Sequence, residues 1–158
     1  MKSSIMRDVA IRQARADDID AMVVLLQDLF GVEKDFSCHP SKQRQGLQLL
    51  LARQHDAQVY VAEHQGRVVA MCSLQKLVST AEGAYVGLIE DVIVEPSFRG
   101  QGLGSALLAA MESCAQTRGL TRLQLLADRN NRSALNFYHG KKWHGTDLIG
   151  LRKRLSES

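Results

Sequence analysis

The chain has 158 residues, of which 45% are hydrophobic and 23% charged, and its formal net charge is +3. These values predict one globular domain spanning 1–158, and the weak charge does not favour a nucleic-acid partner. The sequence has neither an apolar run of the about 20 residues that cross a bilayer nor the apolar core of a signal peptide, so we expect no membrane partner. Three widely separated cysteines predict neither disulfides nor a zinc site, so we expect a reducing cytoplasm, with Cys72 and Cys114 in packing roles.

The first third of the chain predicts a strand followed by two helices. The stretch 9–14 alternates between apolar and polar residues, as a strand does. Apolar residues then recur at helical spacing over 19–30, with Asp17 or Asp18 as the expected N-cap. A second helix is predicted over 41–54.

The remaining elements predict a mixed sheet. In chain order they are a hairpin around Gln65-Gly66, a strand at 85–94 that is apolar on both faces, a helix from Leu103 to Arg118-Gly119, a buried strand at 121–127, a helix at 131–140 and a strand at 146–155. Three consecutive strands predict an antiparallel meander, and the strand-helix-strand passage predicts a right-handed parallel crossover. The fold class is therefore α/β with the order β-α-α-β-β-β-α-β-α-β.

Three alternating glycines lie where the strand at 85–94 gives way to a helix. Gly100, Gly102 and Gly104 leave room beside backbone N–H groups that lack partners at a helix start, and Arg99 adds a positive charge. This pattern predicts a pyrophosphate site, and the alternative is a flexible turn without a ligand.

Two common nucleotide motifs fit this turn poorly. A P-loop requires a lysine after its last glycine, whereas Ser105 and Ala106 follow Gly104. A dinucleotide fingerprint requires a third glycine at the position of Ser105. A nucleotide-binding module unrelated to coenzyme A is therefore a rival hypothesis with little support.

Two motifs carry a resemblance to a known family. The segment "VEPSFRGQGLGSALL", with Arg99, Gly102 and Gly104, resembles the acetyl-CoA-binding motif of the GNAT superfamily of N-acetyltransferases. The segment "NRSALNFYHGKKW" resembles its second signature through Asn131, Ala134, Phe137 and Tyr138, although two lysines replace the usual Leu-Gly before Trp143. The resemblance spans nearly the whole chain and is greatest to the diamine (spermidine/spermine) branch.

The resemblance implies acetyl-CoA as cosubstrate, and because the histidines lack metal-ligand spacing we expect no metal. It implies a sheet that splays beside the strand ending at Val94. The pantetheine arm would hydrogen-bond to the backbone of that strand, and the pyrophosphate would lie on the glycine turn. The cofactor-binding residues that it implies are Val92, Ile93, Val94, Arg99, Gly100, Gln101, Gly102, Leu103, Gly104, Ser105, Asn131, Ala134 and Tyr138.

Acetyl transfer to an amine requires a base, because an aliphatic amine of pKa about 10.4 is almost entirely protonated at pH 7. Glu90 and Asp91 are the candidates, and on a regular strand they face opposite sides, so only one can line a given cleft. The resemblance favours Glu90 as base and leaves Asp91 as a structural acceptor. The alternative is that Glu90 pairs with an arginine or attracts a cationic substrate.

Tyr138 is the candidate acid for the departing thiolate, because a phenol of pKa about 10 can donate to a thiolate of pKa about 8.5. The pattern alone favours a tyrosine packed on an apolar helix face, and the motif match favours the catalytic role. The oxyanion donor would be a backbone N–H near Val92 to Val94.

The resemblance places the acceptor pocket near 30–45, the loop near 79–84 and the last strands. Glu33 and Asp35 are candidates to bind a cationic amine, which would suit a polyamine. An amino acid, an aminoglycoside, a protein N-terminus and a ribosomal lysine remain open, as does a homodimer, which is frequent among relatives. The alternative function is a non-catalytic acyl-CoA-binding regulatory domain.

Overall fold

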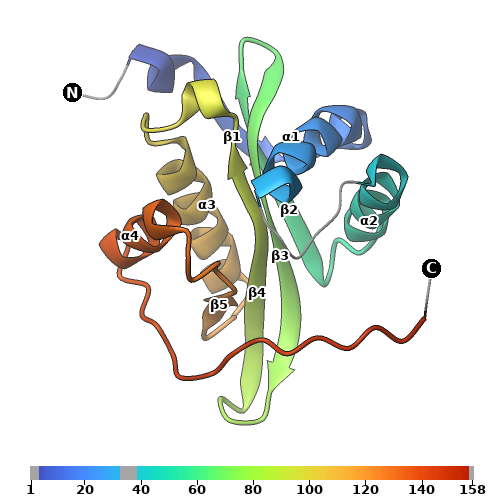
Figure 1. The fold of residues 1–158 in the computed structure, drawn as a ribbon, viewed down its shortest axis with the longest axis vertical. Coiled ribbons are helices and arrows are strands. Elements are labelled where there is room, and N and C mark those ends of the chain that lie inside the picture. Colours follow the sequence, from blue (N-terminus) through green and yellow to red (C-terminus); the bar gives the residue numbers. More distant parts are fainter. Residues whose placement is uncertain (1–3, 33–38, 157–158) are drawn as a thin grey trace. The chain divides into compact units, whose positions relative to one another are not determined.

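The computed structural model describes residues 4–32 and 39–156. The chain divides into two compact units, Met1–Leu125 and Leu126–Ser158, which are described one after the other (Figure 1). No helix within the described residues is long and apolar enough to cross a membrane.

The first unit contains a mixed sheet in the order β1-β2-β3-β4-β5. The strands β1 to β4 pair in antiparallel fashion, and β5 is parallel to β4, so the predicted meander and crossover are confirmed. Their bounds are β1 Val9–Gln13, β2 Ala57–His64, β3 Arg67–Ser79, β4 Ala84–Val94 and β5 Leu123–Leu125.

The sheet splays on one side of β4. β5 pairs only with Gly87 to Ile89, so the later part of β4 has no ladder partner on that edge within the described part of this unit. The predicted strand at 121–127 shrinks to three residues, and Leu126 is 72% exposed, so the expectation that it is buried was wrong at that end.

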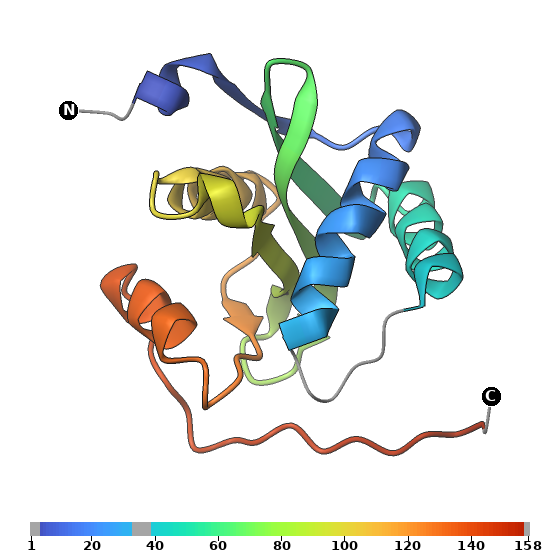
Figure 2. The same cartoon turned by 45° about the horizontal axis from the view of Figure 1, so that its top comes forward.

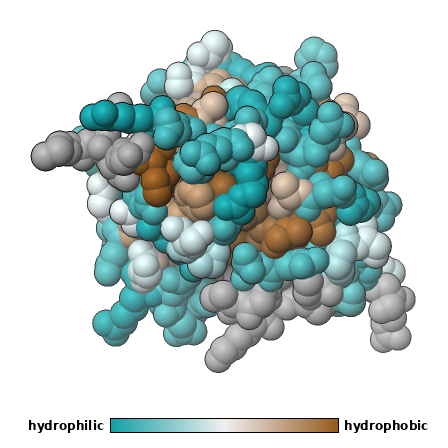
Figure 3. Space-filling model, turned by 90° about the horizontal axis from the view of Figure 1, so that it is seen from above, coloured by the Kyte–Doolittle hydropathy of each residue, from teal (hydrophilic) through white to brown (hydrophobic). Residues whose placement is uncertain are grey.

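Helices cover both faces of the sheet in the first unit. α1 (Ile19–Val32) and α2 (Pro40–Ala52) lie on one face, and α3 (Leu103–Thr117) lies on the other (Figures 1 and 2). The core between α1, α2 and the strands includes Met22, Leu26, Leu47, Val61, Met71 and Ile93. On the face seen in Figure 3, hydrophilic side chains cover most of the surface.

Local turn chemistry explains where several elements begin and end. Gln65 and Gly66 both have positive φ, 50° and 78°, as the predicted two-residue hairpin requires. α3 ends before Gly119 at φ 74°, where glycine supplies the left-handed stop. At α1 the N-cap prediction was wrong, because a short 3-10 turn over Ala16–Asp18 precedes the helix and its N-cap is Arg15.

The second unit contains α4 (Arg132–Gly140), whose predicted N-cap is confirmed by a 3.1 Å hydrogen bond from the Ala134 N–H to Oδ1 of Asn131. The strand predicted at 146–155 was wrong, because residues 141–156 contain no strand. Ile149 and Leu151 are 67% and 89% exposed. Alternation describes a side-chain pattern, whereas a strand also needs a ladder partner, and the described residues of this unit offer none.

Candidate active site

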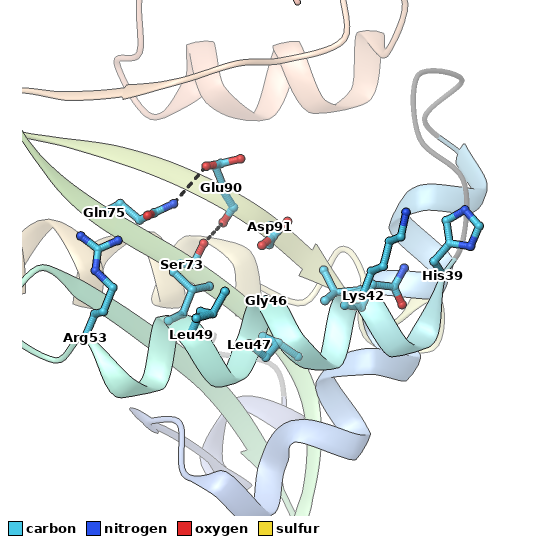
Figure 4. A pocket seen from close by; sticks show the side chains of 13 residues that line it. His39, Lys42, Gly46, Leu47, Leu49, Arg53, Ser73, Gln75, Glu90 and Asp91 are labelled. Atoms are coloured by element: carbon cyan, nitrogen blue, oxygen red, sulfur yellow. Dashed lines mark hydrogen bonds between the residues drawn. The ribbon is translucent and has the colours of Figure 1, made fainter. Parts of the chain in front are cut away.

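A cleft of about 450 Å³ opens in the first unit between α2 and the strands β3 and β4 (Figure 4). One face of α2 forms the first wall through His39, Lys42, Gly46 and Arg53, at the spacing that places side chains on one side of a helix. The opposite wall comes from the strands, with Ser73 and Gln75 on β3 and Glu90 and Asp91 on β4.

Glu90, the predicted base, lines this cleft with an exposed side chain. Nε2 of Gln75 donates a hydrogen bond to its carboxylate Oε1 at 3.4 Å, and the Ser73 hydroxyl donates to its backbone oxygen at 3.2 Å (Figure 4). Of these two contacts from β3, the one from Gln75 orients the carboxylate without burying it, and the one from Ser73 holds the backbone.

Asp91 interrupts the regular alternation of β4. Its φ is +53°, in the left-handed region, and the pairing register shifts between Met71 and Ser73 on β3. Such a bulge adds a residue to one strand and turns the following side chains. Glu90 and Asp91 therefore both line the cleft, and the expectation that only one of them could was wrong (Figure 4).

The segment Val92 to Val94 combines a buried side and an open edge. Ile93 is 4% exposed, and it pairs with Met71 on β3. On the other edge, β5 no longer accompanies β4 beyond Ile89. The backbone of this segment can therefore accept an extended ligand as an added strand.

The turn from Arg99 to Ser105 has the geometry of an anion site. Gly100 and Gly102 have φ values of 73° and 93°, and Gly102 is the N-cap of α3 without any side-chain cap. The Ala106 N–H bonds to the Gly102 carbonyl at 3.0 Å, so the preceding N–H groups of the first turn lack intrahelical acceptors. A Cβ at Gly100 would meet nothing within 4 Å, so the space beside the turn is open.

Arg99 and Gln101 have contacts that hold the turn in place. Nε of Arg99 donates to the Val94 carbonyl at 2.9 Å, which connects the turn to the end of β4. Nε2 of Gln101 donates to the Ser97 carbonyl at 3.3 Å. Arg99 thus brings a positive charge to the junction between the strand edge and the turn.

The second unit holds the other predicted residues together on α4. Asn131 caps the helix through the Ala134 N–H, and the half-buried Tyr138 lies about two turns after Asn131. Its ring contacts the edges of Phe137 and Trp143 at centroid distances of 5.3 and 6.1 Å. The aromatic contacts limit the rotation of the phenol ring.

The described cysteines do not provide a nucleophile beside the cleft. Burial, with a smaller effect from the Asp91 carboxylate, raises the pKa of Cys72 to about 12. The thiol is therefore almost entirely protonated near neutral pH, which agrees with the predicted packing role.

Several cleft residues were missed in the sequence. Lys42 and Arg53 were read only as parts of a helix, although their spacing with Gly46 places them on one face. The substrate candidates Glu33 and Asp35 lie outside the described residues. Within the described ranges, no group of three or more His, Cys, Asp or Glu is placed to hold a metal ion.

Comparison with known proteins gives a consistent result along the chain. The acetyltransferase (GNAT) family matches residues 19–145. An aminoalkylphosphonate N-acetyltransferase of Salmonella typhimurium is 30% identical over 139 residues, which cover 87% of this chain and 86% of the relative. A glucosamine 6-phosphate N-acetyltransferase of Trypanosoma brucei brucei is 40% identical over 81 residues, 51% of this chain and 53% of the relative.

Solved structures support the fold. A possible acetyltransferase from Clostridium difficile 630 superposes with a TM-score of 0.82 at 18% identity, covering 94% of this chain and 99% of that chain. An acetyltransferase of Trypanosoma brucei superposes with a TM-score of 0.73 at 26% identity, covering 94% and 100%.

Proposed function

The chain belongs to the acetyltransferase (GNAT) family and is an acetyl-CoA-dependent N-acetyltransferase, and we propose that the cleft beside α2 receives its acceptor amine. The observation that carries this proposal is the position of Glu90, which lines the cleft at the point where β4 loses its partner β5. A carboxylate there can take the amine proton beside a strand edge that is open to the cosubstrate.

Glu90 acts as the general base, directly or through water. It removes a proton from the ammonium form of the acceptor. The neutral amine that results is disfavoured by about 4.6 kcal/mol at pH 7 when no base assists. The neutral amine then attacks the thioester carbonyl, and a backbone N–H near Val92 to Val94 stabilises the negative charge that develops on the carbonyl oxygen. Tyr138 donates a proton to the departing sulfur.

Coenzyme A fits the residues of the first unit. The open edge at Val92 to Val94 suits the amide-containing pantetheine arm, and the uncapped start of α3 suits the pyrophosphate. The proposed contacts in this unit are those of Val92, Ile93, Val94, Arg99, Gly100, Gln101, Gly102, Leu103, Gly104 and Ser105. Asn131, Ala134 and Tyr138 stay predictions from the sequence motif.

We further propose that 1–158 functions as one acetyltransferase domain, because the family match over 19–145 includes parts of both units. A small primary amine is the proposed acceptor, since the cleft volume suits a small ligand and the related enzymes are named for small amines. The cytoplasmic location, the homodimer and the diamine branch stay predictions.

The test is release of the CoA thiol from acetyl-CoA with a panel of small amines and a lysine peptide. Glu90→Gln and Tyr138→Phe should each lower kcat about 100-fold or more while leaving the affinity for CoA nearly unchanged. Matched controls are Asp8→Asn, an exposed carboxylate on another element, and Tyr85→Phe, an exposed phenol on β4.

A base differs from a merely structural carboxylate in that Glu90→Gln should lower kcat while leaving the free energy of unfolding nearly unchanged. Wild-type rates in both variants would reject the assignment of base and acid. CoA binding without turnover on any amine would favour the regulatory alternative.

A further inference from the structure

The two walls of the acceptor cleft differ in charge. α2 contributes His39, Lys42 and Arg53, and the opposite wall contributes the carboxylates of Glu90 and Asp91 (Figure 4). An amine with a second positive charge would meet repulsion from the α2 wall. A molecule with one positive and one negative group would match both walls.

The backbone of Arg53 is held in place at the end of the cleft that includes Gln75. Its carbonyl accepts hydrogen bonds from the N–H groups of Asp56 and Ala57 at 2.9 and 2.7 Å, and Ala57 is the residue of β2 that pairs with Gln75. Gln75 in turn contacts the Glu90 carboxylate. Gln75 therefore links the Glu90 carboxylate, through its side chain, to the strand position beside the end of α2 where Arg53 lies (Figure 4).

The guanidinium of Arg53 is available to a ligand. Among the described residues it makes no hydrogen bond and no ion pair, and the nearby Asp56 carboxylate is already paired with Lys76 at 2.9 Å. The side chain is exposed on the cleft wall. A planar guanidinium in this situation can hold a carboxylate, phosphate or phosphonate through two parallel hydrogen bonds.

The end of α2 does not attract an anion by itself. A helix C-terminus carries about half a negative charge, so the full positive charge of Arg53 must supply the attraction. Binding of an anion at this end of the cleft should therefore depend strongly on the Arg53 side chain.

We propose that the acceptor is a small primary amine with an anionic group. In the cleft, Arg53 holds its anion while Glu90 faces its amine. This inference rests on the proposed function of the cleft. Arg53 is then a specificity-determining residue, and Gln75 orients the carboxylate between the two ends of the substrate.

The test compares amines of similar size on the full chain. 2-Aminoethylphosphonate, O-phosphoethanolamine and β-alanine carry the anion, and ethanolamine, propylamine and spermidine do not. The wild type should have a kcat/KM at least tenfold higher with the best anionic amine than with ethanolamine, propylamine or spermidine. The three anionic amines distinguish a phosphonate, a phosphate and a carboxylate as the preferred group.

Arg53→Gln should lower kcat/KM for the anionic amines by about 10- to 100-fold, mostly through KM, with a change of less than twofold for ethanolamine. Arg53→Lys should recover part of the loss. Arg44→Gln is the matched control, because Arg44 lies on the same helix outside the cleft and pairs with Asp20. Titration of 2-aminoethylphosphonate into the CoA-loaded protein should show the same loss in Arg53→Gln without turnover.

Faster acetylation of spermidine or propylamine than of every anionic amine would overturn the inference and leave the proposed acetyltransferase intact. An equal loss of kcat/KM in Arg53→Gln for amines with and without the anionic group would also overturn it, because Arg53 would then act on the fold. Absence of turnover with every amine would reject the proposed function together with the inference.

Discussion

Gln75 on β3 and Glu90 on β4 are joined by a hydrogen bond from the side-chain amide to the carboxylate, with 3.4 Å between Nε2 and Oε1. The pair spans two neighbouring strands inside the cleft beside α2. The contact restricts the rotation of a carboxylate that is otherwise exposed, so Gln75 is a positioning residue for the proposed base.

Replacing Gln75 by Met should therefore lower kcat about threefold, the effect of one weak hydrogen bond, and leave the KM for acetyl-CoA unchanged. Steady-state kinetics at saturating amine give this comparison. Gln45→Met, at an exposed site on α2 outside the cleft, should have wild-type kinetics. An unchanged kcat in Gln75→Met would show that Glu90 is oriented without this contact.

The glycine turn allows a matched pair of substitutions. Gly102 and Gly119 have φ values of 93° and 74°, so alanine at either position should cost about 1–2 kcal/mol of the free energy of unfolding. A Cβ at Gly102 would approach only the Met6 sulfur at 3.9 Å, and at Gly119 it would meet nothing within 4 Å. The stability losses in urea should therefore be similar.

The two glycine variants should differ in coenzyme binding. Gly102→Ala should weaken the affinity for CoA at least tenfold in calorimetric titration, because the N–H groups of the turn lose their positions, whereas Gly119→Ala should bind as the wild type does. Equal affinities would place the pyrophosphate elsewhere.

A partly buried ion-pair network around Asp18, just before α1, should make stability depend on pH. Arg12 contacts Asp18 at 2.8 Å and Glu63 at 2.7 Å, and the Asp18 side chain is only 8% exposed. The hydrogen bond from Arg12 holds the pKa of Asp18 below its ordinary value despite burial. This stabilisation is fully present above the ordinary pKa of about 4 and is lost as the pH falls through the lowered pKa.

Arg12→Met should accordingly lower the free energy of unfolding by about 3 kcal/mol at pH 7, because it leaves a buried carboxylate unpaired. The difference from the wild type should shrink as urea titrations are repeated below pH 4. Arg7→Met, at an exposed site, should stay within about 0.5 kcal/mol of the wild type. A difference independent of pH would assign the loss to packing rather than to the ion pair.

The Cys72 thiol should resist alkylation in the native protein. Its pKa of about 12 leaves roughly 1 thiol in 10,000 ionised at pH 8, and the side chain is buried. Iodoacetamide labelling followed by peptide mapping should find Cys72 unmodified until denaturant is added. Labelling of native Cys72 at the rate of a small free thiol would contradict the buried position.

Elements with strong local signals were predictable from the sequence. The left-handed pair Gln65-Gly66, the N-cap Asn131 and the uncapped start of α3 at Gly102 all depend on a few adjacent residues. The glycine turn and the position of Glu90 in a cleft followed from the same local information together with the family motif.

Features that depend on distant pairing were not predictable in this way. The bulge at Asp91 arises from the register between β3 and β4, and an aspartate carries no local signal as clear as a glycine. The cleft role of Arg53 depends on which face of α2 packs on the sheet. The predicted strand at 146–155 failed for a related reason, because alternation is present but a pairing partner is not given by the sequence pattern.

The bulge at Asp91 also has a consequence for insertions and deletions. Side chains of a strand keep their faces when residues are exchanged one for one, but a change in length shifts all later residues by one position. Asp91 is an exception, because Glu90 pairs with Ser73 and Ile93 with Met71, so β4 has one extra residue between these two pairs. Deleting Asp91 would leave both pairs in register and remove only the second carboxylate from the cleft. We therefore expect Asp91 to be the position of β4 at which a one-residue deletion keeps the pairing with β3, whereas a deletion elsewhere along the strand shifts it.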